Sequence, residues 1–294
     1  MALQTSEITL PRSVVPETVN IVKGISTIAQ LSPSTPQLFT DQTHLIFNPT
    51  SEAEVVAEGA AKGSYTQTLT PIEGKRVKLV TTTRVSNELQ WADEDAKTEI
   101  IQHIIEDQAE AVARAVDYVI YHAVNPKTGA ALAGYTSLIS GAKSVTATDD
   151  PSADIDSLVE ALIDYQVNGI ALSRQFAADL RKVRVAATGQ RLYPEIPLSL
   201  NAGTVDGIPS VTSNTVDGKL ITPDTGVRAI MGDFSTIKWG MVREMKSEII
   251  EYGDPDGAGT DLKNVNQVAY RTESMFAYAI LDPQAFAYLK KASA

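Results

Sequence analysis

The spacing of apolar residues predicts one very long helix between about residues 93 and 124. Apolar side chains recur there at steps of three and four, which places them in one stripe along a helix. Asn125-Pro126 is expected to end it, because the residue before a proline disfavours helical conformation. About 32 residues at 1.5 Å each span roughly 48 Å, whereas a 100-residue domain is only about 26 Å across. The stripe comprises Ile101, Ile104, Ile105, Val112, Val116, Val119, Ile120 and Ala123.

The residues before this helix predict extended structure. Residues 45–58 contain two short apolar runs, and residues 64–86 alternate polar and apolar side chains and are rich in Thr and Val, as half-exposed strands are. We expect a long hairpin that goes out through residues 53–62 and returns through residues 77–86. A hairpin that buries little on itself, followed by so long a helix, indicates a subunit completed by its neighbours. Basic residues are expected near the tip: Lys62, Lys75, Arg76 and Lys78.

The first 44 residues are polar and interrupted by Pro11, Pro16, Pro33 and Pro36. A segment of this composition is either disordered or laid along another surface. Within it, residues 14–29 favour a short helix or an extended segment.

The second half of the chain has a different pattern, typical of an α/β unit followed by two long strands. Ser173 is a candidate N-cap for a helix over about residues 174–183. Residues 254–259 are rich in turn-forming residues and are expected to join the long strands. The other predicted elements are a helix at 153–166, short strands at 170–172, 208–212, 219–222 and 227–231, and the long strands at 236–252 and 264–281.

The chain of 294 residues is acidic, with 25 Lys and Arg against 36 Asp and Glu and a formal net charge of −11. This balance excludes general electrostatic binding of a phosphate backbone, which needs clustered Lys and Arg. Part of the excess lies on the predicted long helix, where the only basic residues between 93 and 117 are Lys97 and Arg114. One face of that helix is therefore expected to be strongly acidic. Its acidic residues are Asp93, Glu94, Asp95, Glu99, Glu106, Asp107, Glu110 and Asp117.

The absence of cysteine excludes a disulfide framework, thiolate metal sites and a thiol nucleophile. The N-terminus lacks the basic and apolar regions of a secretory signal. No apolar run reaches the roughly 18–20 residues that a membrane helix needs.

No group of residues singles out an active site. The three histidines, His44, His103 and His122, are scattered and lack the spacing of a zinc motif. The acidic run at residues 254–257, with Asp261, departs from a calcium loop because its glycine comes too early and no Glu closes it. Nucleotide-binding and hydrolase motifs are absent. We therefore interpret the acidic run as an ordinary turn and expect neither a metal, nor a cofactor, nor enzymatic activity.

The order of these elements resembles the major capsid proteins of tailed bacteriophages, the HK97-fold group. The resemblance extends over nearly the whole chain, from the outgoing arm Ala53-Glu54-Val55-Val56-Ala57-Glu58 and the long acidic helix to a closing segment at Arg271–Pro283. Three shorter motifs lie between them in the same order: Asn168-Gly169-Ile170-Ala171-Leu172-Ser173, Asp206-Gly207-Ile208-Pro209-Ser210-Val211 and Gly232-Asp233-Phe234-Ser235.

The resemblance implies an α+β, HK97-like fold with four parts. These are an N-terminal arm (1–44), an extended hairpin called the E-loop (45–86), a peripheral P-domain built on the long spine helix (87–134 and 239–278) and an axial A-domain (135–238 and 279–294). In such shells the A-domains meet at the centre of each pentamer or hexamer, and the arm and E-loop lie across neighbouring subunits. The residues expected to contact those neighbours are Glu58, Lys62, Lys75 and Arg76.

The implied function is that of a structural head protein that self-assembles into an icosahedral shell around double-stranded phage DNA. The spine helix faces the interior in such shells, so Glu106, Asp107 and Glu110 would repel the duplex and let it slide during packaging. Portal and decoration proteins are further expected partners. A separate scaffolding protein is also expected, because the chain reaches the arm almost directly after Met1. Assembly is expected in the bacterial cytoplasm, with the virion head as the final location.

Some members of the family lock the shell with an isopeptide bond between an E-loop Lys and an Asn of a neighbouring P-domain, assisted by a Glu. The resemblance places Asn266 and Glu273 at the Asn and Glu positions. Leu69 or Thr70 falls near the Lys position, however, and Lys75 is only the nearest lysine. We therefore favour ordinary strand residues over a crosslink. A denaturing gel of mature particles distinguishes a 31.6 kDa monomer from a ladder of multimers.

Two other functions stay open at this point. An encapsulin-type nanocompartment shares the fold and encloses a protein cargo, although the long arm and E-loop favour a phage. A soluble α/β enzyme would instead form a small discrete particle with a pocket containing perturbed carboxylates. Negative-stain microscopy separates shells or capsomers from monomers.

Overall fold

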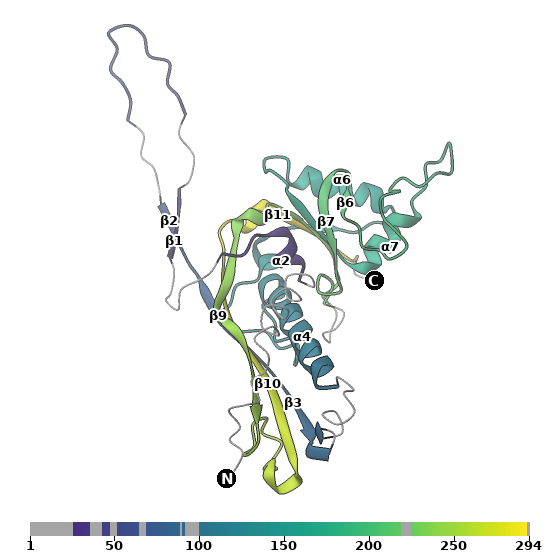
Figure 1. Ribbon diagram of the computed structural model, residues 1–294. Helices are drawn as coiled ribbons and strands as arrows, with labels where there is room; N and C mark the ends of the chain where they lie inside the picture. The colour runs from purple at the N-terminus through teal and green to yellow at the C-terminus, as the bar shows by residue number, and fades with distance from the viewer. Residues whose placement is uncertain are drawn as a thin grey trace.

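Three β-sheets and one long helix organise the described part of the chain (Figure 1). The computed structural model describes residues 26–35, 43–47, 52–64, 69–88, 90–91, 100–218 and 225–292, with the backbone alone at residues 100 and 243–246. Most of the predicted arm, the first turns of the predicted spine helix at 92–99 and the predicted strand at 219–222 therefore lie outside the described residues.

The elements follow one another in the order that the sequence predicts. The helices are α2 (Thr27–Leu31), α4 (Ile100–His122), α5 (Leu138–Gly141), α6 (Pro151–Ala161) and α7 (Arg174–Lys182), with 3-10 helices η2 (Phe234–Thr236), η3 (Lys263–Val265) and η4 (Pro283–Ala285). The strands are β1 (Thr43–Phe47), β2 (Leu69–Glu73), β3 (Lys75–Ser86), β4 (Lys143–Thr146), β5 (Gly169–Leu172), β6 (Thr204–Val205), β7 (Ile208–Thr212), β8 (Val227–Gly232), β9 (Ile237–Ile250), β10 (Gln267–Ile280) and β11 (Phe286–Lys290).

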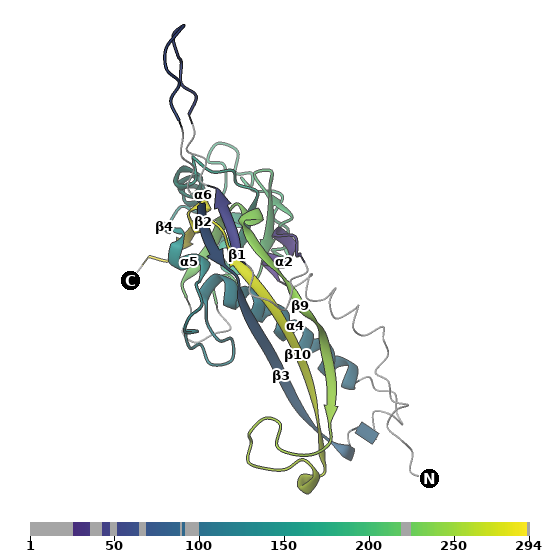
Figure 2. The same ribbon diagram turned by 90° about the vertical axis from the view of Figure 1, so that its left-hand side faces the viewer.

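A long antiparallel sheet of order β3-β10-β9 lies along α4 (Figure 2). The two predicted long strands are β9 and β10, and the turn-rich segment joins them. Gln108 of α4 fixes the helix to the sheet, since its Nε2 donates to the Tyr270 carbonyl at 2.9 Å and its Oε1 accepts from the Thr272 hydroxyl at 2.6 Å. This buried amide is fully engaged, as buried polar groups in folded proteins usually are.

The second half of α4 is buried on nearly every side, which one apolar stripe alone does not predict. Residues 115–121 are all buried, under the sheet, α2 and the β7–β8 connection. The helix ends at His122, two residues before the predicted end at 124. Ala123 adopts a left-handed backbone (φ 51°), and its carbonyl accepts from the Leu132 N–H at 2.8 Å, which turns the chain away before Pro126 is reached.

A mixed six-stranded sheet of order β4-β11-β8-β5-β7-β6 forms a second body with α6 and α7. The Ser173 cap is confirmed, because its Oγ accepts from the Phe176 N–H at the start of α7. Asp206 and Gly207 both have positive φ and form the two-residue turn between β6 and β7, as Asp-Gly does in tight hairpins. α6 ends five residues before the predicted position at 166, because the chain leaves helical geometry at Leu162.

Two of the short sequence motifs interlock in this body. The Asn168 side chain accepts from the Phe234 N–H at 2.8 Å and donates to Asp233 at 2.5 Å. Gly232 lies where β8 passes the η4–β11 corner, and a Cβ there would come within 2.4 Å of the Ala285 carbonyl oxygen. Only glycine fits so close a backbone approach.

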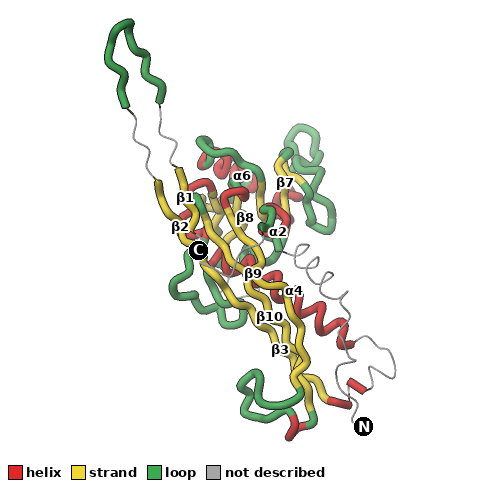
Figure 3. The backbone as a smooth tube through the Cα atoms, turned by 60° about the vertical axis from the view of Figure 1, so that its left-hand side comes forward, coloured by secondary structure: helices red, strands yellow, loops and turns green. Residues whose placement is uncertain are grey.

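The smallest sheet is the two-stranded hairpin of β1 and β2, which projects from the rest of the chain (Figure 3). The prediction that residues 77–86 return beside residues 53–62 in one hairpin is wrong. These residues form β3 and pair with β10, from Lys75 opposite Tyr278 to Ser86 opposite Gln267. Val77, Leu79 and Val85 provide the reason, since burying them against α4 and β10 removes more apolar surface from water than a hairpin of polar arms could.

Candidate assembly surfaces

The projecting hairpin exposes apolar side chains that no described part of the chain covers. Leu45, Phe47 and Leu69 on its two strands are 59%, 59% and 51% exposed, and Val55 beyond them is 99% exposed. Every described residue from 52 to 64 is exposed. An isolated two-stranded hairpin is marginally stable in water, and apolar side chains gathered on an extension indicate a surface for another molecule.

The structure separates the basic residues that the sequence places at the hairpin tip. Lys62, with Glu58, lies in the exposed outer part. Lys75, Arg76 and Lys78 instead lie at the start of β3, at the base of the hairpin, so their predicted position at the tip is wrong. The cause is again the pairing of β3 with β10.

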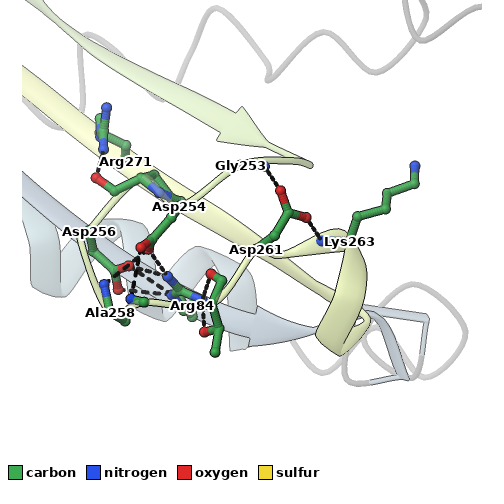
Figure 4. Close-up of polar contacts among 11 residues, drawn as sticks. Arg84, Gly253, Asp254, Asp256, Ala258, Asp261, Lys263 and Arg271 are labelled. Carbon is green, nitrogen blue, oxygen red and sulfur yellow. Dashed lines mark hydrogen bonds and ion pairs between the residues drawn. The ribbon is translucent and has the colours of Figure 1, made fainter.

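The β9–β10 loop at the opposite end of the long sheet is held by two arginines (Figure 4): Arg271 on β10 donates to the Pro255 carbonyl, and Arg84 makes the larger set of contacts. The Arg84 guanidinium on β3 donates to Asp254 (2.6 Å), to both carboxylate oxygens of Asp256 and to the Thr260 carbonyl (3.1 Å). This interaction lowers the pKa of Asp256 to about 2, chiefly through the hydrogen bonds from Arg84. The sequence offers no local signal for this contact, because Arg84 precedes Asp256 by 172 residues.

Backbone N–H groups also donate hydrogen bonds to carboxylates of this loop. Asp254 accepts from Ala258 and Gly259, and Asp261 accepts from Gly253 and Lys263. These partners make the acidic run a folded turn. Within the described part of the chain no group of three His, Cys, Asp or Glu side chains is placed to hold a metal ion.

A buried carboxylate on α4 joins three distant segments. Asp117 is fully buried and accepts from the Ser26 hydroxyl, from the Thr27 N–H (2.9 Å) and hydroxyl (2.8 Å), and from the Thr215 hydroxyl (2.6 Å). Burial raises its pKa, and the hydrogen bonds from Ser26, Thr215 and Thr27 oppose that rise. Its predicted place on an exposed acidic face is therefore wrong. The side chain instead ties α2 and the β7–β8 connection to α4.

The cavity between β3 and α4 does not combine the features of an active site. It measures about 660 Å³ and is lined mostly by apolar residues, with Lys78, Arg114 and Lys127 and with no carboxylate or histidine. The carboxylates whose pKa is shifted are Asp117, Asp206 and Asp256, and none of them lines that cavity. None of the described helices is both long and apolar enough to span a membrane.

Comparison with known proteins identifies the family of this chain. A model of the phage capsid family matches residues 7–291. The chain belongs to the phage capsid family. A solved structure from Mycobacterium phage Ogopogo is 33% identical, with a TM-score of 0.82 over 91% of this chain and 92% of that one.

More distant structures extend the same likeness. A structure from Gordonia phage Cozz is 28% identical with a TM-score of 0.77, over 92% of this chain and 87% of that one. A structure described as the capsid of an empty GTA particle is 16% identical with a TM-score of 0.61, over 100% of this chain and 96% of that one, and shows the shared fold alone. Comparison with curated protein sequences finds no match.

These findings confirm the predicted α+β, HK97-like fold and make this chain a major capsid protein that forms the shell of a phage head. They favour the phage head over the two alternatives, a nanocompartment and an enzyme. Phage capsid proteins assemble into shells of oligomers, so the exposed surfaces described above are candidates for contacts between copies.

The capsid protein does not bring the three crosslink candidates together within one copy. Lys75 starts β3 opposite Tyr278, whereas Asn266 lies just before β10 at the other end of the sheet. Asn266 bonds with Asn87 and Glu88. Glu273 lies between them and pairs with Lys78 at 3.1 Å and with Arg271 at 4.0 Å. Any covalent bond among these residues would have to join different copies.

The acidic residues predicted for the inner face lie together on the first half of α4. Asp107 is exposed, and the side chains of Glu106 and Glu110 are 42% and 47% exposed. Arg114 pairs with Glu110 at 3.3 Å and His103 lies 3.5 Å from Glu106. This part of the helix extends beyond the buried segment, so its carboxylates remain available to whatever this face meets.

Proposed function

We propose that the capsid protein builds its shell by laying the hairpin of one copy across a neighbouring copy. The exposed apolar residues of the hairpin carry this proposal: Leu45, Phe47, Leu69 and Val55 have no partner of their own among the described residues. Removing them from water requires another subunit, and a second copy is the partner always present in a homomeric shell.

In this proposal the remaining parts keep the roles that the sequence suggests. Residues 1–44 act as an arm, residues 87–134 and 239–278 form the P-domain with β3, and residues 135–238 and 279–294 form the A-domain. The pairing of β3 with β10 supports limiting the extended part of the E-loop to residues 43–73. Glu58 and Lys62 at the tip, and Lys75 and Arg76 at the base, are the charged contacts to the neighbour.

The same proposal covers partners and location. The shell encloses phage DNA without sequence-specific binding and is assembled in the host cytoplasm with a separate scaffolding protein and a portal, with decoration proteins as further candidates. The chain acts in this proposal as a structural protein and not as a catalyst, which its membership of the phage capsid family supports. We favour a shell without isopeptide crosslinks, since Lys75 belongs to β3 and not to the extended hairpin.

The test is a triple substitution, Leu45→Ser, Phe47→Ser and Leu69→Ser, in the full-length protein. We expect the thermal unfolding temperature to stay within a few degrees, because these side chains are already exposed. We expect the fraction that sediments as capsomers or shells to fall at least about tenfold, since roughly 1.4 kcal/mol per contact already gives that factor. Leu45→Val, Phe47→Leu and Leu69→Val form the matched control, which keeps the positions apolar.

Two results would contradict this proposal. A wild-type protein that stays monomeric in negative-stain images and in sedimentation, with scaffolding protein present, would contradict self-assembly itself. A serine variant that assembles as well as the wild type would contradict the role of the hairpin alone.

A further inference from the structure

One surface of the A-domain is mainly acidic and partly apolar. Between residues 149 and 164 there are six acidic residues and no basic one. Asp154 is buried and bonds to Thr148, and Asp150 caps α6, so both have structural roles. The others lie exposed beside Val159 and Ile163, which are 47% and 79% exposed. We call this the acidic face: Asp149, Asp156, Val159, Glu160, Ile163 and Asp164.

The acidic face follows one side of α6 and its C-terminal extension. Asp156, Val159 and Glu160 are spaced three and four residues apart and lie on one side of α6, and Ile163 follows in the turn directly after the helix. The opposite side carries Ile155, Leu158 and Leu162, which are buried in the core of the domain. Since that core is already filled, the two exposed apolar residues have no partner on their own domain.

A second surface of the A-domain has the complementary character. Residues 181–192 contain four basic residues and no acidic one: Arg181, Lys182, Arg184 and Arg191. Arg181 and Lys182 end α7, and Arg184 and Arg191 lie in the small hairpin that follows. This hairpin is closed by a bridge between Arg184 and Arg191 and by a hydrogen bond from the Val185 N–H to the Gln190 carbonyl at 2.9 Å. Val185 and Leu192 are 36% and 42% exposed. We call residues 181–192 the basic hairpin.

Within one copy, the charged residues of the acidic face and of the basic hairpin form no ion pair with each other among the described residues. Lys182 pairs with Asp179 at 2.9 Å, but across the described residues neither Arg184 nor Arg191 takes part in an ion pair. Glu160 and Asp164 likewise form no ion pair in the described part of the chain, and the neighbouring Lys143 ammonium instead donates to the Ala161 carbonyl at 2.8 Å and lies over the Tyr165 ring. α6 runs along the top of the domain in Figure 1, and α7, from which the basic hairpin leaves, lies below it at the side.

We propose that the basic hairpin of one copy docks on the acidic face of the next copy around a capsomer. The two patches differ in residues, so the contact is heterologous, and repeated contacts of this kind close a ring. Each patch combines two exposed apolar side chains with charges of a single sign, and the signs are opposite. Copies with a net charge of −11 repel one another overall, so complementary local patches are needed to set their register. This inference rests on the proposed self-assembly and names one of its contacts.

A charge exchange tests the contact in the full-length protein. We expect Glu160→Lys with Asp164→Lys to reduce the fraction sedimenting as capsomers or shells at least about tenfold, because like charges facing each other are strongly unfavourable. Arg184→Glu with Arg191→Glu should do the same. Combining all four substitutions restores opposite signs and should restore assembly. Glu160→Asp with Asp164→Glu keeps the charge and should assemble normally.

A second rescue variant separates a local contact from an effect of net charge. Lys127→Glu with Lys263→Glu, added to Glu160→Lys and Asp164→Lys, gives the same net charge as the four-fold exchange. Both lysines are exposed and lie outside the A-domain patches, after α4 and in η3. We expect this combination not to restore assembly.

The absence of cysteine allows a direct check of proximity. Ile163→Cys with Val185→Cys should give a disulfide-linked ladder on a non-reducing gel of capsomers, and each single variant should not.

Several results would overturn the proposal. They are normal assembly of both charge-reversed variants, rescue by the Lys127 and Lys263 substitutions, or absence of the ladder from assembled particles. Normal shells that lose only a bound protein or nucleic acid would assign the basic hairpin to another partner. In each case the wild-type shells would still support self-assembly, so the two proposals fail separately.

Discussion

At the scale of single residues, Asp117 does more to organise this subunit than its place in the sequence suggests. Its carboxylate accepts hydrogen bonds from Ser26, Thr27 and Thr215, which lie 90 residues or more away along the chain. A buried carboxylate is tolerated only when such partners replace water. The side chain thereby fixes the start of α2 against α4 and the β7–β8 connection.

We expect Asp117→Asn to lower the free energy of unfolding by roughly 2–4 kcal/mol, because the new amide N–H₂ would face hydroxyl and backbone donors that then lose their acceptor. Chemical denaturation of the unassembled subunit measures this change. Asp107→Asn on the exposed face of the same helix is the control and should stay within about 0.5 kcal/mol. Equal effects of the two variants would contradict the anchoring role of Asp117.

Sequence alone cannot identify such a residue, because its environment is set by tertiary contacts. Asp117 occupies a position between apolar neighbours on a long helix, and its periodicity fits an acidic face as well as a buried anchor. Ser173 could be predicted, in contrast, because capping depends only on the residues that follow it. Asp206-Gly207 is a local signal of the same kind, since both residues of its turn need positive φ.

At the scale of elements, the loop between β9 and β10 is held by a contact that is sensitive to pH. The pKa of Asp256 is lowered to about 2 by Arg84, from about 3.9 in an unfolded chain. Because the pKa of Asp256 is lower in the folded state, the interaction stabilises the fold fully at a pH above the pKa of the unfolded state. This stabilisation is lost as the pH falls through the pKa of the folded state. The loop should therefore loosen between about pH 4 and pH 2.

Hydrogen exchange at Ala258 and Gly259, corrected for the intrinsic rate at each pH, measures this loosening. We expect Arg84→Lys to raise exchange at these amides at neutral pH, because a lysine cannot bridge Asp254, Asp256 and Thr260 together. Lys78→Gln, which removes the exposed pair with Glu273 on the same strand, should leave exchange in this loop unchanged. Equal protection in Arg84→Lys and wild type would contradict the role of Arg84.

The positions of most helices and strands could be predicted from the sequence, but the pairing of the strands could not. Residues 236–252 and 264–281 read as long strands joined by a turn because alternation and turn residues are local signals. The same alternation identified residues 64–86 as extended but could not decide whether residues 77–86 pair with the outgoing arm at 53–62 or with β10. That choice depends on how much apolar surface of Val77, Leu79 and Val85 can be buried, which requires the position of α4.

At the scale of the whole molecule, the subunit consists of two well-packed bodies and exposed parts that are incomplete by themselves. One core is filled by large side chains such as Trp239, Phe276 and Tyr121, and the other by Leu158, Leu162 and Phe176. The projecting hairpin, the acidic face and the basic hairpin have no such cover. A shell subunit needs this division, because the bodies must fold before assembly and the exposed parts must stay available for it.

The acidic residues at the exposed end of α4 give a prediction about the assembled head. We expect Glu106→Lys, Asp107→Lys and Glu110→Lys together to leave shell assembly intact, since the pairs they remove with Arg114 and His103 are exposed and weak. If this face lines the interior, the new lysines would bind the phosphates of the packaged duplex and slow its movement. Nuclease-protected DNA per particle and the rate of DNA ejection should then both decrease.

A neutral set of substitutions separates attraction between the new lysines and the DNA from the simple loss of negative charge. The neutral set Glu106→Gln, Asp107→Asn and Glu110→Gln removes the carboxylates without adding phosphate ligands, so its ejection rate should stay near the wild-type rate. Attraction between lysine and phosphate weakens as salt rises, so raising the salt from about 50 to 200 mM should reduce the defect of the lysine set. Unchanged packaging and ejection in the lysine set would show that this end of α4 does not meet the DNA. A defect of equal size in both sets, insensitive to salt, would instead indicate that these carboxylates serve the shell and not the passage of DNA.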